Sequence, residues 1–167
     1  AGKHNLTFRL AFRDAGWVFH EGLVWVKDSM VLGHSDYHVR HEDILYGYKP
    51  GVGRVGRGNH DGTRWYGGHS QTTVFEIDRP KVSKEHPTMK PSALVVAHLE
   101  NSSKRGDIVL DPFLGSGTTL VACAQLGRRG YGMEIDPRYV AVTLERLAGM
   151  GFAPRLEAVT KVGRKTK

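Results

Sequence analysis

The sequence is poor in cysteine and in long apolar runs. Cys123 is the only cysteine among 167 residues, which excludes an intrachain disulfide and fits a reducing compartment. It lies in the apolar stretch "LVACAQLG", where we expect a buried structural thiol. No apolar run approaches the roughly 20 residues of a membrane helix, and no secretion leader opens the sequence. We therefore expect a soluble, cytoplasmic protein without membrane contact.

Acidic residues are also scarce relative to basic ones. The sequence has 17 Asp and Glu residues and 24 Lys and Arg residues, which gives a formal net charge of +7. A basic chain of this kind suits a polyanionic partner, although charge alone does not separate DNA from RNA or from simple solubility.

Histidines at positions 34, 38 and 41 have a spacing that would suit a zinc site on a helix. No cysteines support that interpretation, and the segment "HSDYHVRHED" lacks a helical pattern and leads into a strand. We expect solvated or structural histidines here and no bound metal.

The first third of the sequence predicts a helix followed by two strands. Leu6 and Leu10 stand at helical spacing in residues 5–15, and strand-like runs follow at 17–27 and 42–49, the first of them interrupted near Gly22.

The second half predicts an alternating α/β order. A strand at 72–78 and a helix from Pro91 precede four segments that read strand, helix, strand, helix: "DIVLDPF", "GTTLVACAQLG", "RGYGMEI" and "PRYVAVTLERLAG". This alternation predicts a parallel sheet covered by helices.

The stretch "LDPFLGSGTTL" joins the first of those strands to its helix. Gly115 and Gly117 let the backbone approach a ligand where a parallel strand ends and a helix begins. Glu134 ends the next strand, about 20 residues later, where an acid accepts hydrogen bonds from ribose hydroxyls. The pattern indicates an adenosine compound, and a tight turn that binds no ligand is the alternative.

Three adenosine ligands compete for this turn. A triphosphate loop needs a lysine after the last glycine, but Thr118 and Thr119 stand there, and a dinucleotide fingerprint needs a small residue where Leu120 stands. Asp111 would repel a pyrophosphate but suits the ammonium group of a methionine moiety. S-adenosyl-L-methionine fits best.

Two elements together resemble the amino-group (N6-adenine or N4-cytosine) DNA methyltransferases. These are "EHPTMKP" at 85–91 and "DPFLGSGTT" at 111–119. The order of elements resembles the subgroup whose cofactor half follows its catalytic half in the chain. The resemblance implies a Rossmann-like methyltransferase sheet, incomplete in this sequence, in a cytoplasmic enzyme of bacterial or phage type linked to restriction and modification.

The resemblance also implies site residues and regions. The cofactor contacts it implies are His86, Pro87, Thr88, Lys90, Asp111, Pro112, Phe113, Gly115, Ser116, Gly117, Thr118 and Glu134. Residues 1–48 correspond to distal elements of the sheet, 49–84 to the target-recognition region and 85–167 to the cofactor-binding part of a single domain.

The glycine- and arginine-rich stretch 49–71 falls where the family carries its target-recognition region. Basic side chains here would meet phosphates, and aromatic rings would stack on bases or wedge into the duplex. The candidate DNA contacts are Arg54, Arg57, Arg64, Trp65 and Tyr66. A surface loop with incidental charge is the alternative.

One family element is missing. Catalysis in this family centres on an (Asp/Asn/Ser)-Pro-Pro-(Tyr/Phe/Trp) segment, because a poorly nucleophilic exocyclic amine needs acceptors for its hydrogens and a ring that stacks on the flipped base. The sequence holds no Pro-Pro pair, so no catalytic residue is assigned. We hypothesise that the segment and its strands belong to an amino-terminal half, present as a separate chain, a cleaved piece, a dimer partner or the remainder of a larger gene product.

The sequence thus predicts the cofactor-binding and target-recognition part of a DNA amino-methyltransferase that acts on double-stranded DNA, with adenine N6 favoured over cytosine N4. A cofactor- or DNA-binding module without activity and an RNA methyltransferase stay open as alternatives. No segment of 49–71 resembles an RNA-binding module, which ranks the RNA enzyme lower.

Overall fold

The structure is a computed structural model, and it describes residues 4–34, 36–51, 65–80 and 89–157. Its elements are α1 (Asn5–Asp14), β1 (Val18–Val31), β2 (Val39–Tyr48), β3 (Val74–Glu76), α2 (Ser92–Ser102), β4 (Ile108–Asp111), α3 (Thr118–Leu126), β5 (Arg129–Gly132) and α4 (Pro137–Gly149). Each element that the sequence predicts is present. β1 continues beyond its expected end, and β2 begins before its expected start, so both strands are longer on the side of the connection between them.

The first sheet has the strand order β2-β1-β3. β1 pairs with β2 in antiparallel fashion and with β3 in parallel fashion. The interruption expected near Gly22 is wrong: β1 continues through this residue, and the register shifts fall between Phe19 and Glu21 and between Val26 and Val31. Helix α1 packs against β1, but Leu6 and Leu10 are 70% and 40% exposed, so its apolar spacing does not mark a buried face.

The second sheet consists of β4 and β5, which pair in parallel register from Ile108↔Arg129 to Asp111↔Gly132. Helix α3 covers one face, and a Cβ at Gly132 would lie 2.6 Å from a methyl carbon of Leu114, so the close approach requires glycine. Cys123 on α3 is 1% exposed, and burial raises the pKa of its thiol, as expected for a structural cysteine.

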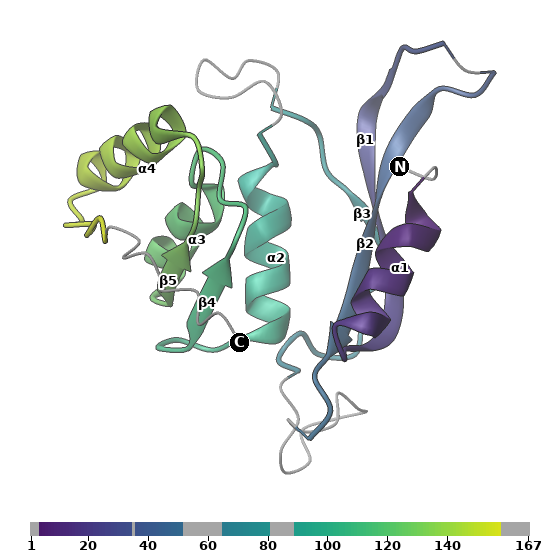
Figure 1. The fold of residues 1–167 in the computed structure, drawn as a ribbon, viewed down its shortest axis with the longest axis horizontal. Coiled ribbons are helices and arrows are strands. Elements are labelled where there is room, and N and C mark those ends of the chain that lie inside the picture. Colours follow the sequence, from purple (N-terminus) through teal and green to yellow (C-terminus); the bar gives the residue numbers. More distant parts are fainter. Residues whose placement is uncertain (1–3, 35, 52–64, 81–88, 158–167) are drawn as a thin grey trace, which may run out of the picture.

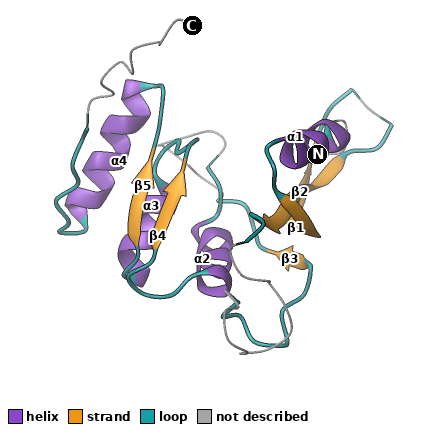
Figure 2. Cartoon of the chain, turned by 60° about the horizontal axis from the view of Figure 1, so that its bottom comes forward, coloured by secondary structure: helices purple, strands orange, loops and turns teal. Residues whose placement is uncertain are grey.

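The two sheets are not joined to each other among the described strands. Helix α2 lies between them and packs against α3 (Figures 1 and 2). Within the described residues β2 and β3 each pair only with β1, and β4 and β5 pair only with each other, so each sheet has two open edges, among them those of β2 and β4. The fold is therefore α/β with its sheet in two parts, as expected for an incomplete Rossmann-like sheet.

No helix in the described part of the chain combines the length and hydropathy that a membrane span requires.

Candidate functional site

Asp111 closes β4 and ties the strand end to the following helix. One carboxylate oxygen accepts a hydrogen bond from the Phe113 N–H at 2.9 Å, and the other accepts one from the Thr119 hydroxyl at 2.6 Å. A carboxylate has about four lone-pair positions, so each oxygen can accept one further donor.

The turn after Asp111 depends on two glycines. Gly115 and Gly117 have φ angles of 57° and 84°, in the left-handed region that side-chain-bearing residues avoid. A Cβ at Gly117 would also lie 2.6 Å from the Thr143 side chain on α4. Gly117 precedes α3, and no side chain of the described residues caps this end of the helix, which leaves N–H groups of the first turn for a ligand.

Glu134 brings the end of β5 to the same turn. One carboxylate oxygen accepts from the Gly115 N–H at 2.7 Å and the other from the Asp136 N–H at 2.8 Å. The backbone hydrogen bond from Asp136, followed by that from Gly115, lowers the pKa of Glu134, so the carboxylate is ionised at neutral pH.

Helix α4 supports the turn from behind. The Arg146 guanidinium donates to the Ser116 carbonyl oxygen at 2.6 Å, and Ser116 is only 4% exposed. Asp136 caps the helix by accepting from the Arg138 N–H at 2.9 Å, and the Arg138 side chain lowers the pKa of Asp136 to about 2.

A cavity of about 390 Å³ opens where β4 and β5 end, within the size range of small-molecule sites. Seven of the residues predicted as cofactor contacts line it: Lys90, Asp111, Phe113, Gly115, Ser116, Thr118 and Glu134. Pro112 and Gly117 belong to the same turn but do not line the cavity, and His86, Pro87 and Thr88 lie outside the described residues.

Five lining residues were not predicted from the sequence: Met89, Val95, Leu114, Thr119 and Tyr139. Met89, Leu114 and Thr119 stand inside the two quoted motifs, so their neighbours were a usable signal. Val95 and Tyr139 reach the cavity because their positions on α2 and α4 face it, which depends on how these helices pack.

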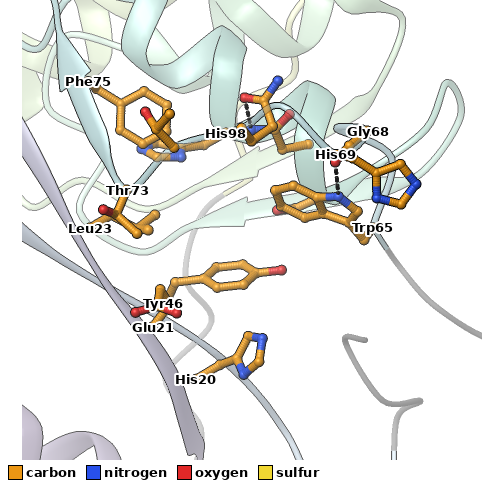
Figure 3. Close-up of a pocket in the computed structure, with 14 residues that line it drawn as sticks. His20, Glu21, Leu23, Tyr46, Trp65, Gly68, His69, Thr73, Phe75 and His98 are labelled. Atoms are coloured by element: carbon orange, nitrogen blue, oxygen red, sulfur yellow. Dashed lines mark hydrogen bonds between the residues drawn. The ribbon is translucent and has the colours of Figure 1, made fainter. Parts of the chain in front are cut away.

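A second cavity, of about 320 Å³, lies at the opposite end of α2. Asn101 and Ser102 near the end of α2 line it, whereas Val95 near the start of the helix lines the first cavity. Figure 3 shows Tyr46 and Trp65 on one side of this second cavity and Phe75 beside His98 on another.

Two of the predicted DNA contacts lie at this second cavity or next to it. The Trp65 indole N–H donates to the Gly68 carbonyl oxygen at 2.8 Å, and its ring packs against Tyr46 with the ring centres 6.2 Å apart. The Tyr66 N–H donates to the Asn101 carbonyl oxygen at 2.8 Å, and the side chain is 43% exposed. DNA contact by these two residues stays a prediction, and Arg54, Arg57 and Arg64 lie outside the described residues.

No group of three or more His, Cys, Asp or Glu side chains suited to a metal ion occurs in the described ranges. His41 lies on β2, and His34 and His38 lie in the connection between β1 and β2.

The family model described as DNA methylase matches residues 2–145 of this chain. The chain belongs to the DNA methylase family. The type II methyltransferase M.HpaI from Haemophilus parainfluenzae is 32% identical over 155 residues, which covers 86% of this chain and 49% of that protein. This DNA methylase chain therefore spans about half the length of the curated relatives it matches.

Solved structures show the same fold. The M1.HpyAVI–SAM complex matches with a TM-score of 0.68 and 25% identity, covering 88% of this DNA methylase chain and 70% of that one. The protein TTHA0409 from Thermus thermophilus, in complex with S-adenosyl-L-methionine, matches with a TM-score of 0.66 and 28% identity, covering 88% and 60%.

Proposed function

We propose that this chain is the S-adenosyl-L-methionine-binding part of an amino-group DNA methyltransferase. The observation that carries the proposal is the cavity at the ends of β4 and β5, where two carboxylates and an uncapped helix N-terminus converge. Two structural relatives are described as complexes with this cofactor, which supports the same ligand here.

The residues of the cavity fit the chemical groups of that cofactor. Glu134 keeps one lone pair on each oxygen for the two ribose hydroxyls, and Asp111 keeps acceptor capacity and negative charge for the ammonium group of the methionine moiety. Phe113, 89% exposed at the cavity, offers an apolar ring that an adenine base would cover.

The cofactor, when bound, supplies a methyl group activated by its positively charged sulfur. The chain's own contribution is to bind and orient the cofactor. The carboxylates hold the two ends of the ligand, and the backbone of the turn sets how far the ligand enters the cavity. We place the catalytic acceptors outside these 167 residues, because the sequence holds no Pro-Pro segment.

The open sheet edges support a partner for this chain. β4 and β2 each present an unpaired edge among the described strands, and the face of the β4–β5 sheet that α3 does not cover exposes Ile108 and Leu110 at 64% and 62%. We propose that an amino-terminal half inserts its strands between β2 and β4. Through-space NMR contacts joining β2 directly to β4 in a monomer would refute this arrangement.

Calorimetric titration with S-adenosyl-L-methionine, followed by a labelled methyl-transfer assay on duplex DNA, tests the function. We expect binding without transfer by the chain alone. Failure to bind overturns the cofactor site, whereas transfer by the chain alone overturns our placement of the catalytic segment.

The product identifies the acceptor once the amino-terminal half is added. We expect labelled N6-methyladenine after hydrolysis of the DNA to nucleosides. N4-methylcytosine would contradict the preference for adenine, and transfer only to RNA would contradict the DNA substrate.

A further inference from the structure

One carboxylate on β2 binds two lysine side chains. The carboxylate of Glu42 pairs through one oxygen with Lys27 Nζ at 2.8 Å and through the other with Lys90 Nζ. Both ammonium groups lie 5.4 Å from the ring centre of Trp25, which stands opposite Glu42 in the β1–β2 register. Trp25 is 3% exposed and donates its indole N–H to the Ile77 carbonyl oxygen at 2.7 Å, so it is a fixed platform for both lysines.

The two lysines differ in their surroundings. The Lys27 side chain is 9% exposed and that of Lys90 48%. A buried ammonium group needs its counter-charge, so Lys27 and Glu42 form a permanent pair on the first sheet. The Lys90 ammonium is the solvent-facing member, and the cluster as a whole keeps one net positive charge, from two cations and one anion.

Lys90 also lines the candidate cofactor cavity, which Glu42 and Lys27 do not reach. It stands just before Pro91, the N-cap residue of α2, whereas Asp111 ends β4 and Glu134 follows β5. The Glu42–Lys90 pair therefore connects the rim of the cavity to the first sheet, across 48 residues of sequence.

The charges that line the cavity give Lys90 a specific task. Asp111 and Glu134 are acidic, and Lys90 is the one Lys or Arg among the described residues that line it. A methionine moiety carries an ammonium group and a carboxylate. With Asp111 toward the ammonium group, the carboxylate requires a cation, and Lys90 supplies it.

We infer that Glu42 is a positioning residue for the cofactor cavity: its carboxylate holds the Lys90 ammonium at the rim, where it meets the carboxylate of the methionine moiety. This inference rests on the proposed cofactor. Lysine has a long flexible stem, and a fixed partner removes the rotamer freedom that binding would otherwise have to remove. Lys27 balances Glu42, so the ligand meets a positive cluster.

Two ligands separate this role from a merely structural one. S-adenosyl-L-methionine carries the amino-acid carboxylate, whereas 5′-methylthioadenosine carries the adenosine and thioether without it. Because Glu42→Gln alone leaves Lys27 buried without its anion, the double variant Lys27→Met/Glu42→Gln is titrated as well, by calorimetry on the full chain.

We expect the double variant to bind S-adenosyl-L-methionine about tenfold more weakly than the unmodified chain and to bind 5′-methylthioadenosine with unchanged affinity. Lys90→Met should give the same pattern, and it should cost less in the double variant than in the unmodified chain, because Glu42 acts only through Lys90. Asp43→Asn is the matched control, because it removes the same charge from the adjacent residue, which contacts Asn5 on α1 instead.

An equal loss for both ligands would show that Glu42 only stabilises the fold, and tighter binding of S-adenosyl-L-methionine would show that Glu42 competes for Lys90. Either result overturns the inference while the cofactor site stands. If the unmodified chain binds neither ligand, the proposed function fails and the inference fails with it.

Discussion

The two sheets of this molecule are stabilised by contacts of different range. In the β4–α4 region, residues 108–149, Asp111 bonds to groups two and eight residues away and Glu134 to a group 19 residues away. In the β1–β3 region, residues 18–76, Trp25 bonds to a carbonyl 52 residues away, and Glu42 reaches a lysine 48 residues away. The proposed cofactor site therefore combines a locally encoded turn with a rim that depends on distant strands.

This contrast has a consequence for function. A local strand–turn–helix unit can hold most of a cofactor site before the rest of the sheet is complete, since its polar groups satisfy one another. The rim, by contrast, exists only when the first sheet is folded and α2 is docked between the two sheets. Variants in the two regions should therefore affect binding and stability differently.

The largest effect is expected from Gly117→Ala in the β4–α4 region. The substitution combines a left-handed backbone with a clash against Thr143, and we expect it to lower the free energy of unfolding by about 3 kcal/mol. Urea denaturation measures it. Gly106→Ala is the control, because Gly106 has a φ of 87° and no described atom within 4 Å of the added carbon. Gly106→Ala is expected to lower the free energy of unfolding by about 1 kcal/mol. Equal losses in the two variants would show that the contact with Thr143 does not contribute.

Asp111→Ala should weaken S-adenosyl-L-methionine binding about 100-fold, because it removes a charged acceptor and frees both the Phe113 N–H and the Thr119 hydroxyl. Asp111→Asn, which keeps an acceptor but no charge, should lose about tenfold. Calorimetry gives both values. Asp107→Asn, a neutralised acid at the other end of β4 that does not line the cavity, is the control. Unchanged affinity in both Asp111→Ala and Glu134→Ala would overturn the site.

Glu134→Gln should weaken binding about tenfold, a smaller loss because an amide oxygen still accepts one of the two backbone N–H groups. A competition experiment tests whether Glu134 contacts the ribose. The unmodified chain should prefer adenosine over 2′-deoxyadenosine as a competitor of S-adenosyl-L-methionine, and the variant should lose that preference. A variant that keeps the preference would assign the ribose to another group.

The sequence predicted the β4–α4 region well because its determinants are local. Asp111, which ends an apolar run, bonds to groups two and eight residues away, and Asp136 caps α4 through the N–H two residues later, so the spacing of these residues reports the structure directly. Six of the predicted cofactor contacts line one cavity for this reason, whereas the seventh, Lys90, lies outside this region and pairs with Glu42 on the first sheet.

The β1–β3 region was less predictable because its contacts are distant in sequence. Nothing near Glu42 indicates that it meets Lys27 and Lys90, and nothing near Trp65 indicates that its ring packs against Tyr46. The apolar spacing of α1 correctly indicates a helix but does not indicate a buried face, because helical periodicity does not show what lies against the apolar side chains.

The last and smallest effect uses pH to separate the cavity at the end of α2, which His98 lines together with Phe75 of β3, from the β4–α4 region. Burial lowers the pKa of His98 below 6.5, its Nε2 has no hydrogen-bond partner among the described residues, and its ring packs against Phe75 with the ring centres 4.7 Å apart. The unfolded chain therefore binds a proton at this histidine more readily than the folded chain does. Stability should be complete above pH 6.5 and should fall as the pH drops through 6.5 toward the lower folded value.

The acids of the β4–α4 region act in a lower window. Asp136 titrates at about 2 in the folded chain against 3.8 ordinarily, so its contribution is present above 3.8 and is lost toward pH 2. His98→Gln should therefore flatten the stability profile between pH 7 and 5 in urea denaturation and leave the fall below pH 4 intact. If His98→Gln keeps the same slope of stability against pH between pH 7 and 5, the proton taken up on unfolding binds to another group of the chain. The cavity at the end of α2 would then not contribute to this pH dependence.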